Sequence, residues 1–89
     1  MLEQDIIISN KLGLHARASA KLVQLVSGFR STVMISCRGR EINAKRIMGL
    51  MLLAAGIRTP IRLRVDGEDE VAAMAAVVDL FNRKFDEGE

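Results

Sequence analysis

The spacing of apolar and polar residues alternates along the chain between the two-residue period of strands and the wider period of helices. Residues 5–9 (DIIIS) form a short β-branched run, residues 32–37 (TVMISC) alternate with Val33, Ile35 and Cys37 on one face, and residues 61–65 (IRLRV) alternate strictly. These patterns are typical of half-buried strands. Residues 38–40 (RGR) indicate a tight turn into a fourth short strand over 41–43, which would pair with 32–37 as a hairpin.

Three other segments have helical spacing. The first begins at Ala16 and ends near Gly28. The second covers residues 45–53, with Asn43 as its predicted cap and Gly56 as its end. The third runs from Asp69 to about residue 84, and its predicted buried stripe consists of Val71, Met74, Ala75, Val78, Phe81 and Phe85.

The predicted order is therefore β-α-β-β-α-β-α, in one domain over residues 1–89. Strands and helices do not alternate regularly, so we expect an α+β fold with an antiparallel sheet and its helices on one face. Arg62 and Arg64 would lie on the open face of the sheet as solvated charges. Residues 86–89 (DEGE) are interpreted as a solvated acidic tail.

Composition and charge narrow the possible functions. Apolar residues make up 49% of the chain and only three residues are aromatic, so the core should be aliphatic. A net charge of +2 is too small to indicate binding to nucleic acid or to a membrane surface. The predicted strands also lack the aromatic side chains on which an RNA-recognition fold stacks bases.

The remaining motifs exclude several kinds of site. One Cys (Cys37) and one His exclude an intramolecular disulfide and a Cys/His zinc site. No phosphate-binding or dinucleotide-binding glycine motif is present, so we expect no metal and no cofactor. No signal peptide is visible, and the longest apolar stretch, residues 47–57, is too short to span a bilayer. We therefore expect a cytoplasmic protein.

His15, in the stretch NKLGLHARASAKL, is the main candidate for chemistry. It lies at a loop-to-helix junction, where free backbone amides and the helix dipole favour an anion. Arg17 lies in the first turn and can contact a phosphate, and Gly13 permits an unusual backbone path just before it. A lone histidine is often structural, so the residues alone leave two interpretations open: a structural histidine and one that carries a phosphoryl group.

The segment KRIMGLMLLAAG (45–56) is the second candidate. Its apolar residues surround a short helix, and a small domain has little material to bury them all. One interpretation is a helix buried on several sides; the favoured one is an exposed, adaptable docking patch rich in Met.

With both segments in view, the chain resembles the HPr family of phosphocarrier proteins in the bacterial phosphoenolpyruvate-dependent phosphotransferase system. Gly13, His15, Ala16 and Arg17 match the family pattern G-x-H-A-R, and residues 47–51 (IMGLM) match its second helix. The resemblance covers nearly the whole chain. It implies an open-faced sandwich, a four-stranded antiparallel sheet covered by three helices.

The resemblance also implies roles for individual residues. His15 would accept a phosphoryl group at Nδ1 from Enzyme I and pass it to a histidine of an IIA protein. Arg17 and the backbone amides of Ala16 and Arg17 would bind the phosphate. A docking surface would lie beside this site, and the protein would act as a monomer and not as a stand-alone enzyme. The residues expected to line this surface are Ile47, Met48, Met51 and Leu52, with Lys45 and Arg46 at its rim.

Two positions depart from the family pattern. Ala18 replaces a usual proline, which should loosen the helix start slightly, and Arg46 replaces a serine that a regulatory kinase modifies in some members. The chain resembles both the sugar-transport and the nitrogen-regulation branches of the family. A regulatory domain that binds partners without relaying phosphate is the alternative function.

Overall fold

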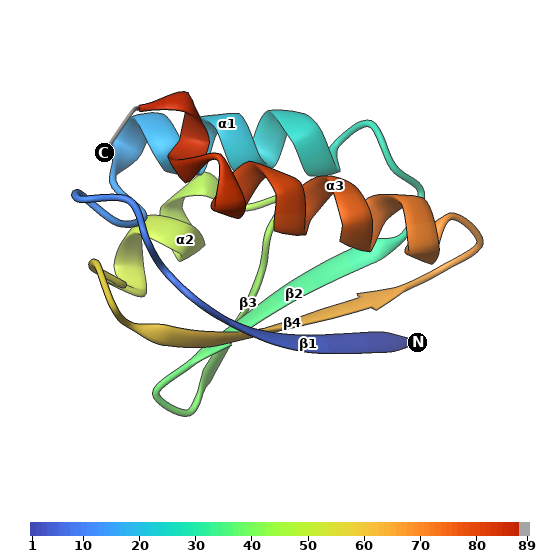
Figure 1. Cartoon of the computed structure of the whole chain (residues 1–89). Helices are drawn as coiled ribbons and strands as arrows, with labels where there is room; N and C mark the ends of the chain where they lie inside the picture. The colour runs from blue at the N-terminus through green and yellow to red at the C-terminus, as the bar shows by residue number, and fades with distance from the viewer. Residues whose placement is uncertain (88–89) are drawn as a thin grey trace.

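The computed structural model describes residues 1–87 of the chain. Four strands and three helices follow in the predicted order (Figure 1). The strands are β1 (Leu2–Ile7), β2 (Thr32–Cys37), β3 (Arg40–Asn43) and β4 (Pro60–Asp66). The helices are α1 (Ala16–Val26), α2 (Ile47–Leu52) and α3 (Glu70–Asn82), and a 3₁₀ turn, η1 (Lys84–Asp86), follows α3.

The strands form one antiparallel sheet in the order β1-β4-β2-β3. All three helices lie on the same side of this sheet, which leaves its other face uncovered (Figure 1). The predicted α+β open-faced sandwich is therefore confirmed. The core between the layers is largely aliphatic, as the composition predicts, and includes the fully buried Leu22, Ile35, Leu50, Leu63 and Val77.

The first strand differs from its prediction of residues 5–9. β1 covers Leu2–Ile7 because the whole polar segment before the β-branched run pairs with β4, from Leu2 opposite Val65 to Ile7 opposite Pro60. Ile8 is buried just beyond the strand and exchanges backbone hydrogen bonds with Arg58 (2.7 Å) and Thr59 (3.0 Å). Pairing with a neighbouring strand therefore extended β1 beyond what side-chain periodicity indicated.

The second helix is shorter than predicted, and Asn43 does not cap it. The Asn43 side-chain oxygen accepts a hydrogen bond from the Lys45 amide (2.9 Å), and its carbonyl accepts one from the Arg46 amide (3.0 Å). Asn43 therefore closes a turn, and α2 begins only at Ile47. The competing local turn of an asparagine side chain explains the difference.

The buried face of α3 also differs from the predicted stripe. Val71 is 72% exposed and Ala75 is exposed, whereas the buried residues of the helix are Ala73, Met74, Val77, Leu80 and Phe81. Alanine and valine occur all around this helix, so its pattern did not determine which side faces the core. Phe85 is buried as predicted, but it lies in η1, after the helix has ended.

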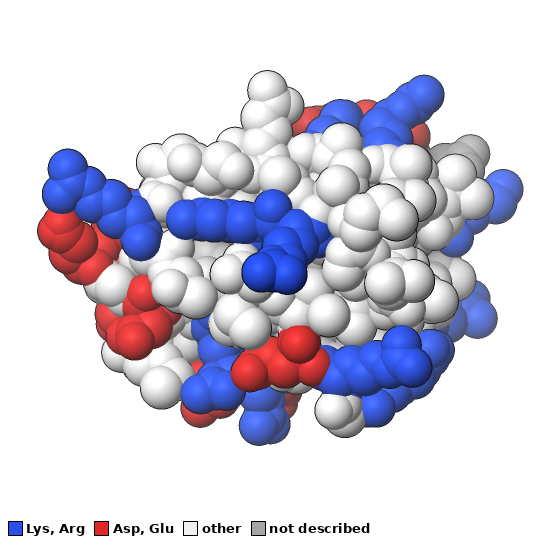
Figure 2. Space-filling model, turned by 180° about the vertical axis from the view of Figure 1, so that it is seen from behind, with Lys and Arg blue, Asp and Glu red and all other residues white. Residues whose placement is uncertain are grey.

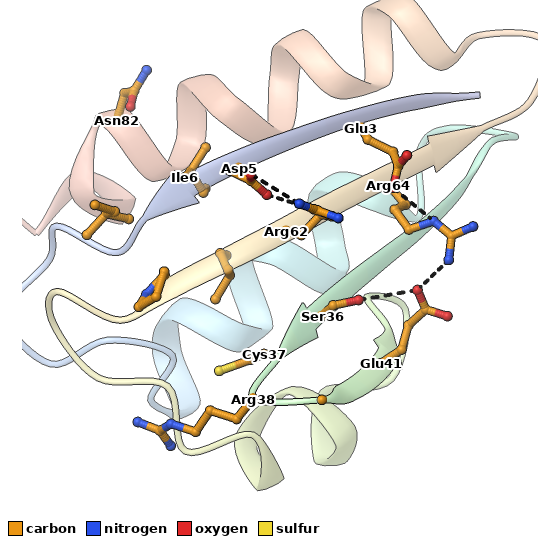
Figure 3. Close-up of a pocket in the computed structure, with 14 residues that line it drawn as sticks. Glu3, Asp5, Ile6, Ser36, Cys37, Arg38, Glu41, Arg62, Arg64 and Asn82 are labelled. Carbon is orange, nitrogen blue, oxygen red and sulfur yellow. Dashed lines mark hydrogen bonds and ion pairs between the residues drawn. The ribbon is translucent and has the colours of Figure 1, made fainter.

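The open face of the sheet carries paired charges (Figure 3). Arg62 contacts Asp5 of β1 (2.8 Å), and Arg64 contacts Glu41 of β3 (2.8 Å) and Glu3 of β1 (3.5 Å). Arg62 and Arg64 thus lie on the predicted face, but they form ion pairs with side chains of the adjacent β1 and, for Arg64, of β3, which lies beyond β2.

Residues 1–87 contain neither a membrane-spanning helix nor a cluster of metal-binding side chains. No helix there is long and apolar enough to cross a membrane, and no group of three or more His, Cys, Asp or Glu side chains could hold a metal ion.

Gly13 occupies a backbone conformation and a space that only glycine fits. Its φ is +64°, and a Cβ atom there would lie 2.2 Å from the carbonyl oxygen of Ala55. We predict that Gly13→Ala lowers the free energy of unfolding by about 2–3 kcal/mol, as measured by urea denaturation. The loss is the sum of backbone strain at a positive φ and the steric clash of the new Cβ atom with the Ala55 carbonyl oxygen. Gly39→Ala is the control. Gly39 also has a positive φ (+80°), but a Cβ atom there would have no other atom within 4 Å, so only the backbone strain of about 1 kcal/mol should lower the free energy of unfolding. Equal losses in the two variants would contradict the clash.

Asp69, at the start of α3, forms hydrogen bonds with the loop before β2. Its carboxylate accepts hydrogen bonds from the Ser31 hydroxyl and from the amides of Arg30 and Ser31 (2.9 Å each). These bonds, that of the Ser31 hydroxyl first, hold the pKa of Asp69 below its ordinary value of 3.8.

The lowered pKa of Asp69 means that its stabilising effect is fully present above pH 3.8 and is lost as the pH falls through the lower, folded-state pKa. Asp69→Asn should therefore lower the Tm at pH 7, and the difference from the unmodified chain should shrink below pH 3.8. Thermal unfolding followed by circular dichroism measures this. Glu68→Gln removes a neighbouring, 62% exposed carboxylate and should change the Tm little at either pH.

Candidate functional site

His15 is the residue that starts α1. Its backbone is extended (φ −76°, ψ −179°), and its carbonyl accepts the first helical hydrogen bond, from the Ser19 amide (2.8 Å). No side chain caps this helix end, and its first turn contains no acidic residue. The helix begins at Ala16 without the usual proline, and Ala18 is fully buried. His15 thus lies at the loop-to-helix junction that the sequence predicts.

The loop before His15 is fixed by a buried asparagine. Asn10 is 1% exposed, and its side-chain amide donates to the Gly13 carbonyl (2.8 Å) while the Gly13 amide donates back to the Asn10 carbonyl (3.2 Å). The Leu14 amide donates to the Ala55 carbonyl (2.9 Å), and the Ser19 hydroxyl donates to the Leu14 carbonyl (3.1 Å). The peptide that carries His15 is therefore anchored to its own turn, to α1 and to the segment after α2.

Two hollows adjoin His15. The larger, of about 590 Å³, is lined by charged residues that include Lys11, Arg17, Lys21 and Glu87. The smaller, of about 350 Å³, is apolar, and Leu12, Leu14 and Met51 are among its lining residues. The imidazole thus lies between a charged hollow suited to an anion and an apolar hollow that reaches α2.

Arg17 is well placed for an anion in the charged hollow. It is exposed in the first turn of α1 and makes no hydrogen bond or ion pair with any residue in 1–87. The amides of Ala16 and Arg17 belong to the first turn, whose N–H groups have no intrahelical acceptor. A guanidinium and free amides at the positive end of a helix together favour a phosphate or a carboxylate.

Glu87 is a neighbour of His15 that the sequence did not reveal. Its Oε2 contacts His15 Nε2, and its Oε1 accepts a hydrogen bond from the Asn10 side chain (3.1 Å). Residues 86–89 were expected to be a solvated tail, but the Glu87 side chain is only 15% exposed. Gly88 and Glu89 lie outside the described residues.

The pKa of Glu87 reflects two opposing influences. Burial raises it, but hydrogen bonds from His15 and Asn10, together with electrostatic attraction to these neighbours and to Lys21, outweigh burial, so the pKa lies below its ordinary value. Glu87 is therefore a carboxylate at neutral pH, in contact with the Nε2 side of the imidazole.

The predicted docking residues are exposed on and before α2. Met48 and Leu52 are 65% and 67% exposed, while Ile47 and Met51 are partly covered. Met51 is the one that lines the apolar hollow beside His15. Lys45 and Arg46 are exposed just before the helix. Figure 2 shows one face of the molecule, on which basic side chains cross a largely uncharged surface and acidic side chains lie toward its margins.

Leu12 extends this apolar surface and was missed in the sequence. It is 65% exposed and lines both hollows beside His15. The available signal was an apolar residue within the otherwise polar turn NKLG, where no core contact explains a leucine.

Comparisons with known proteins agree with this arrangement. The family model "PTS HPr component phosphorylation site" matches residues 2–83. Phosphocarrier protein HPr of Xylella fastidiosa is 60% identical over 98% of each chain, and that of Cupriavidus necator is 55% identical over the full length of both. A crystal structure of HPr from Thermoanaerobacter tengcongensis superposes with a TM-score of 0.94 at 42% identity, over 98% of each chain. The chain therefore belongs to the HPr family of phosphocarrier proteins, which are components of the phosphotransferase system and not stand-alone enzymes.

Proposed function

We propose that His15 is the residue of this phosphocarrier that accepts the phosphoryl group from Enzyme I and passes it to a histidine of an IIA protein. The observation that carries the proposal is the placement of His15 at an uncapped helix N-terminus, beside an arginine that has no partner in residues 1–87. We further propose that the chain acts as a monomer in the cytoplasm, without a cofactor.

The phosphate site is assigned to Arg17 and to the backbone amides of Ala16 and Arg17. The guanidinium can form charge-assisted hydrogen bonds with the phosphoryl oxygens, and the amides need no reorganisation to do the same. The first turn of α1 contains no acidic residue, so no side chain of that turn competes with a phosphate for its amides.

The docking surface is assigned to Ile47, Met48, Met51 and Leu52. Exposed methionine and leucine side chains form an adaptable apolar surface, which suits a carrier that must bind two different partners in turn. The apolar hollow between Met51 and His15 makes this surface continuous with the site of transfer. Lys45 and Arg46 add positive charge at the rim, where it would steer an acidic partner surface.

Transfer itself requires little covalent work from the carrier. The Nδ1 lone pair of His15 forms a bond to phosphorus as the bond between phosphorus and the donor histidine breaks, and the donor nitrogen keeps the electron pair. The same exchange then runs from His15 to the IIA histidine. Positioning of the two nitrogens in line and stabilisation of the phosphoryl charge account for catalysis.

We predict that His15→Ala abolishes an acid-labile gain in mass on incubation with Enzyme I and phosphoenolpyruvate, measured by intact mass spectrometry. Arg17→Ala should keep the modification but lower its rate constant about 10- to 100-fold, because a charged contact to the phosphoryl group is lost. Arg30→Ala removes an 82% exposed arginine beyond the other end of α1 and should leave the rate unchanged. A mass gain that persists in His15→Ala would refute the proposal.

The docking assignment is tested by Met48→Glu. Met48 is 65% exposed, so the variant should fold normally, while its Kd for Enzyme I should rise about tenfold or more because a carboxylate is desolvated in an apolar contact. Isothermal titration calorimetry measures this. The matched control is Val71→Glu, the same kind of change at a 72% exposed residue of α3, which should bind as the unmodified chain does. An equal rise in Kd in both variants would show that Enzyme I does not bind specifically at the surface around Met48.

Transfer of phosphate from the carrier to IIA proteins distinguishes the sugar-transport branch from the nitrogen-regulation branch, and both from the alternative function as a regulatory binding domain. Phosphorylated carrier is offered to a sugar-specific IIA and to a nitrogen-branch IIA, and the faster transfer identifies the branch. A chain that binds these partners but transfers phosphate to neither would be a regulatory binding domain.

A further inference from the structure

We propose that Glu87 is a positioning residue for phosphoryl transfer: its carboxylate holds the Nε2–H group of His15 and thereby presents Nδ1 to the incoming phosphoryl group. The inference rests on the proposed role of His15 and adds a residue 72 positions away in the sequence.

Both oxygens of the Glu87 carboxylate are engaged. Oε2 contacts His15 Nε2, and Oε1 accepts a hydrogen bond from the side-chain amide of Asn10 (3.1 Å). The same amide group donates to the Gly13 carbonyl (2.8 Å), two residues before His15. One buried asparagine therefore fixes both the carboxylate and the turn that carries the imidazole, so their relative positions are set together.

The backbone that carries Glu87 is held in an unusual conformation. Lys84, Phe85 and Asp86 have φ angles of 55°, 54° and 61°, a left-handed conformation that is unfavourable for residues other than glycine. Phe85 is fully buried and packs edge-on against Phe81, with ring centroids 4.9 Å apart. The Lys21 ammonium donates to the Phe85 carbonyl (2.7 Å). Core packing and α1 thus fix this turn, and the turn directs Glu87 toward His15.

The contact has a specific chemical consequence. A carboxylate accepts the hydrogen bond of Nε2–H, which leaves the lone pair on Nδ1. When Nδ1 forms its bond to phosphorus and the donor nitrogen leaves with its electron pair, the proton stays on Nε2 and the ring gains positive charge. Glu87 lies against that charge, as the aspartate of a serine-protease triad lies against its histidine. It would therefore favour the transfer step more than it favours binding of the partner.

The ionisation of Glu87 fits this role. Its pKa lies below the ordinary value, so the group is a carboxylate at neutral pH although its side chain is mostly covered. The basic groups that line the same hollow are Lys11, Arg17 and Lys21, and the only other acidic one among its described lining residues is Asp86.

The test compares Glu87→Gln with Asp79→Asn. The first keeps the shape of Glu87 but removes its charge; the second removes an equal charge from an exposed residue of α3 that pairs with Arg83. Two readouts are used: the ¹⁵N chemical shifts of the His15 ring in the free protein, which report the tautomer, and the steady-state kinetics of phosphorylation by Enzyme I with the carrier as varied substrate. Thermal unfolding checks that both variants fold.

In the unmodified chain and in Asp79→Asn, the shifts should report a proton on Nε2 and a free Nδ1. Glu87→Gln should shift both ring nitrogens toward a mixture of tautomers and lower kcat about tenfold, with KM for the carrier unchanged. Unaltered shifts with an unaltered kcat would overturn the proposal, as would a rise in KM alone. If no variant accepts phosphate, the proposed function fails, while the shifts still decide whether Glu87 sets the tautomer.

Discussion

The close approach of the backbone at Gly13 to the backbone at Ala55 is the constraint on which the site depends. The neighbouring amide, that of Leu14, donates to the Ala55 carbonyl (2.9 Å), and a Cβ atom on Gly13 would lie 2.2 Å from the same oxygen. This contact joins the loop before α1 to the segment after α2. Because of it, His15 and Met51 line one hollow, which brings the proposed docking residue next to the imidazole.

A second principle is that groups of both charges adjoin the imidazole. Arg17 and the amides of the first turn of α1 favour an anion. Glu87 lines the same charged hollow as Arg17, and its carboxylate contacts Nε2 of the ring. Under the proposed function, the first set would attract the phosphoryl oxygens and Glu87 would stabilise positive charge on the ring.

Much of the fold could be predicted from side-chain periodicity alone. Residues 32–37 alternate and form β2 with the predicted bounds, since one face of that strand is buried against the helices. The open-face placement of Arg62 and Arg64 follows from the same argument. Prediction failed where periodicity carries no information: α3 is apolar on several sides, so its buried face could not be identified, and Asn43 had a choice between capping and closing a turn.

The sequence by itself determined the order of elements and the helix start at His15 with Arg17 beside it. It also determined that residues 45–56 contain more apolar side chains than the core of a small domain can bury. Each of these depends on residues close together in the chain, where spacing and geometry are linked directly. Only the tertiary structure decided that Glu87 contacts His15, that Asn10 holds both, and that Leu12 and Met51 share a surface. These contacts join distant segments, and their geometry is set by the packing of Phe85, Gly13 and Ala55, which no local pattern records.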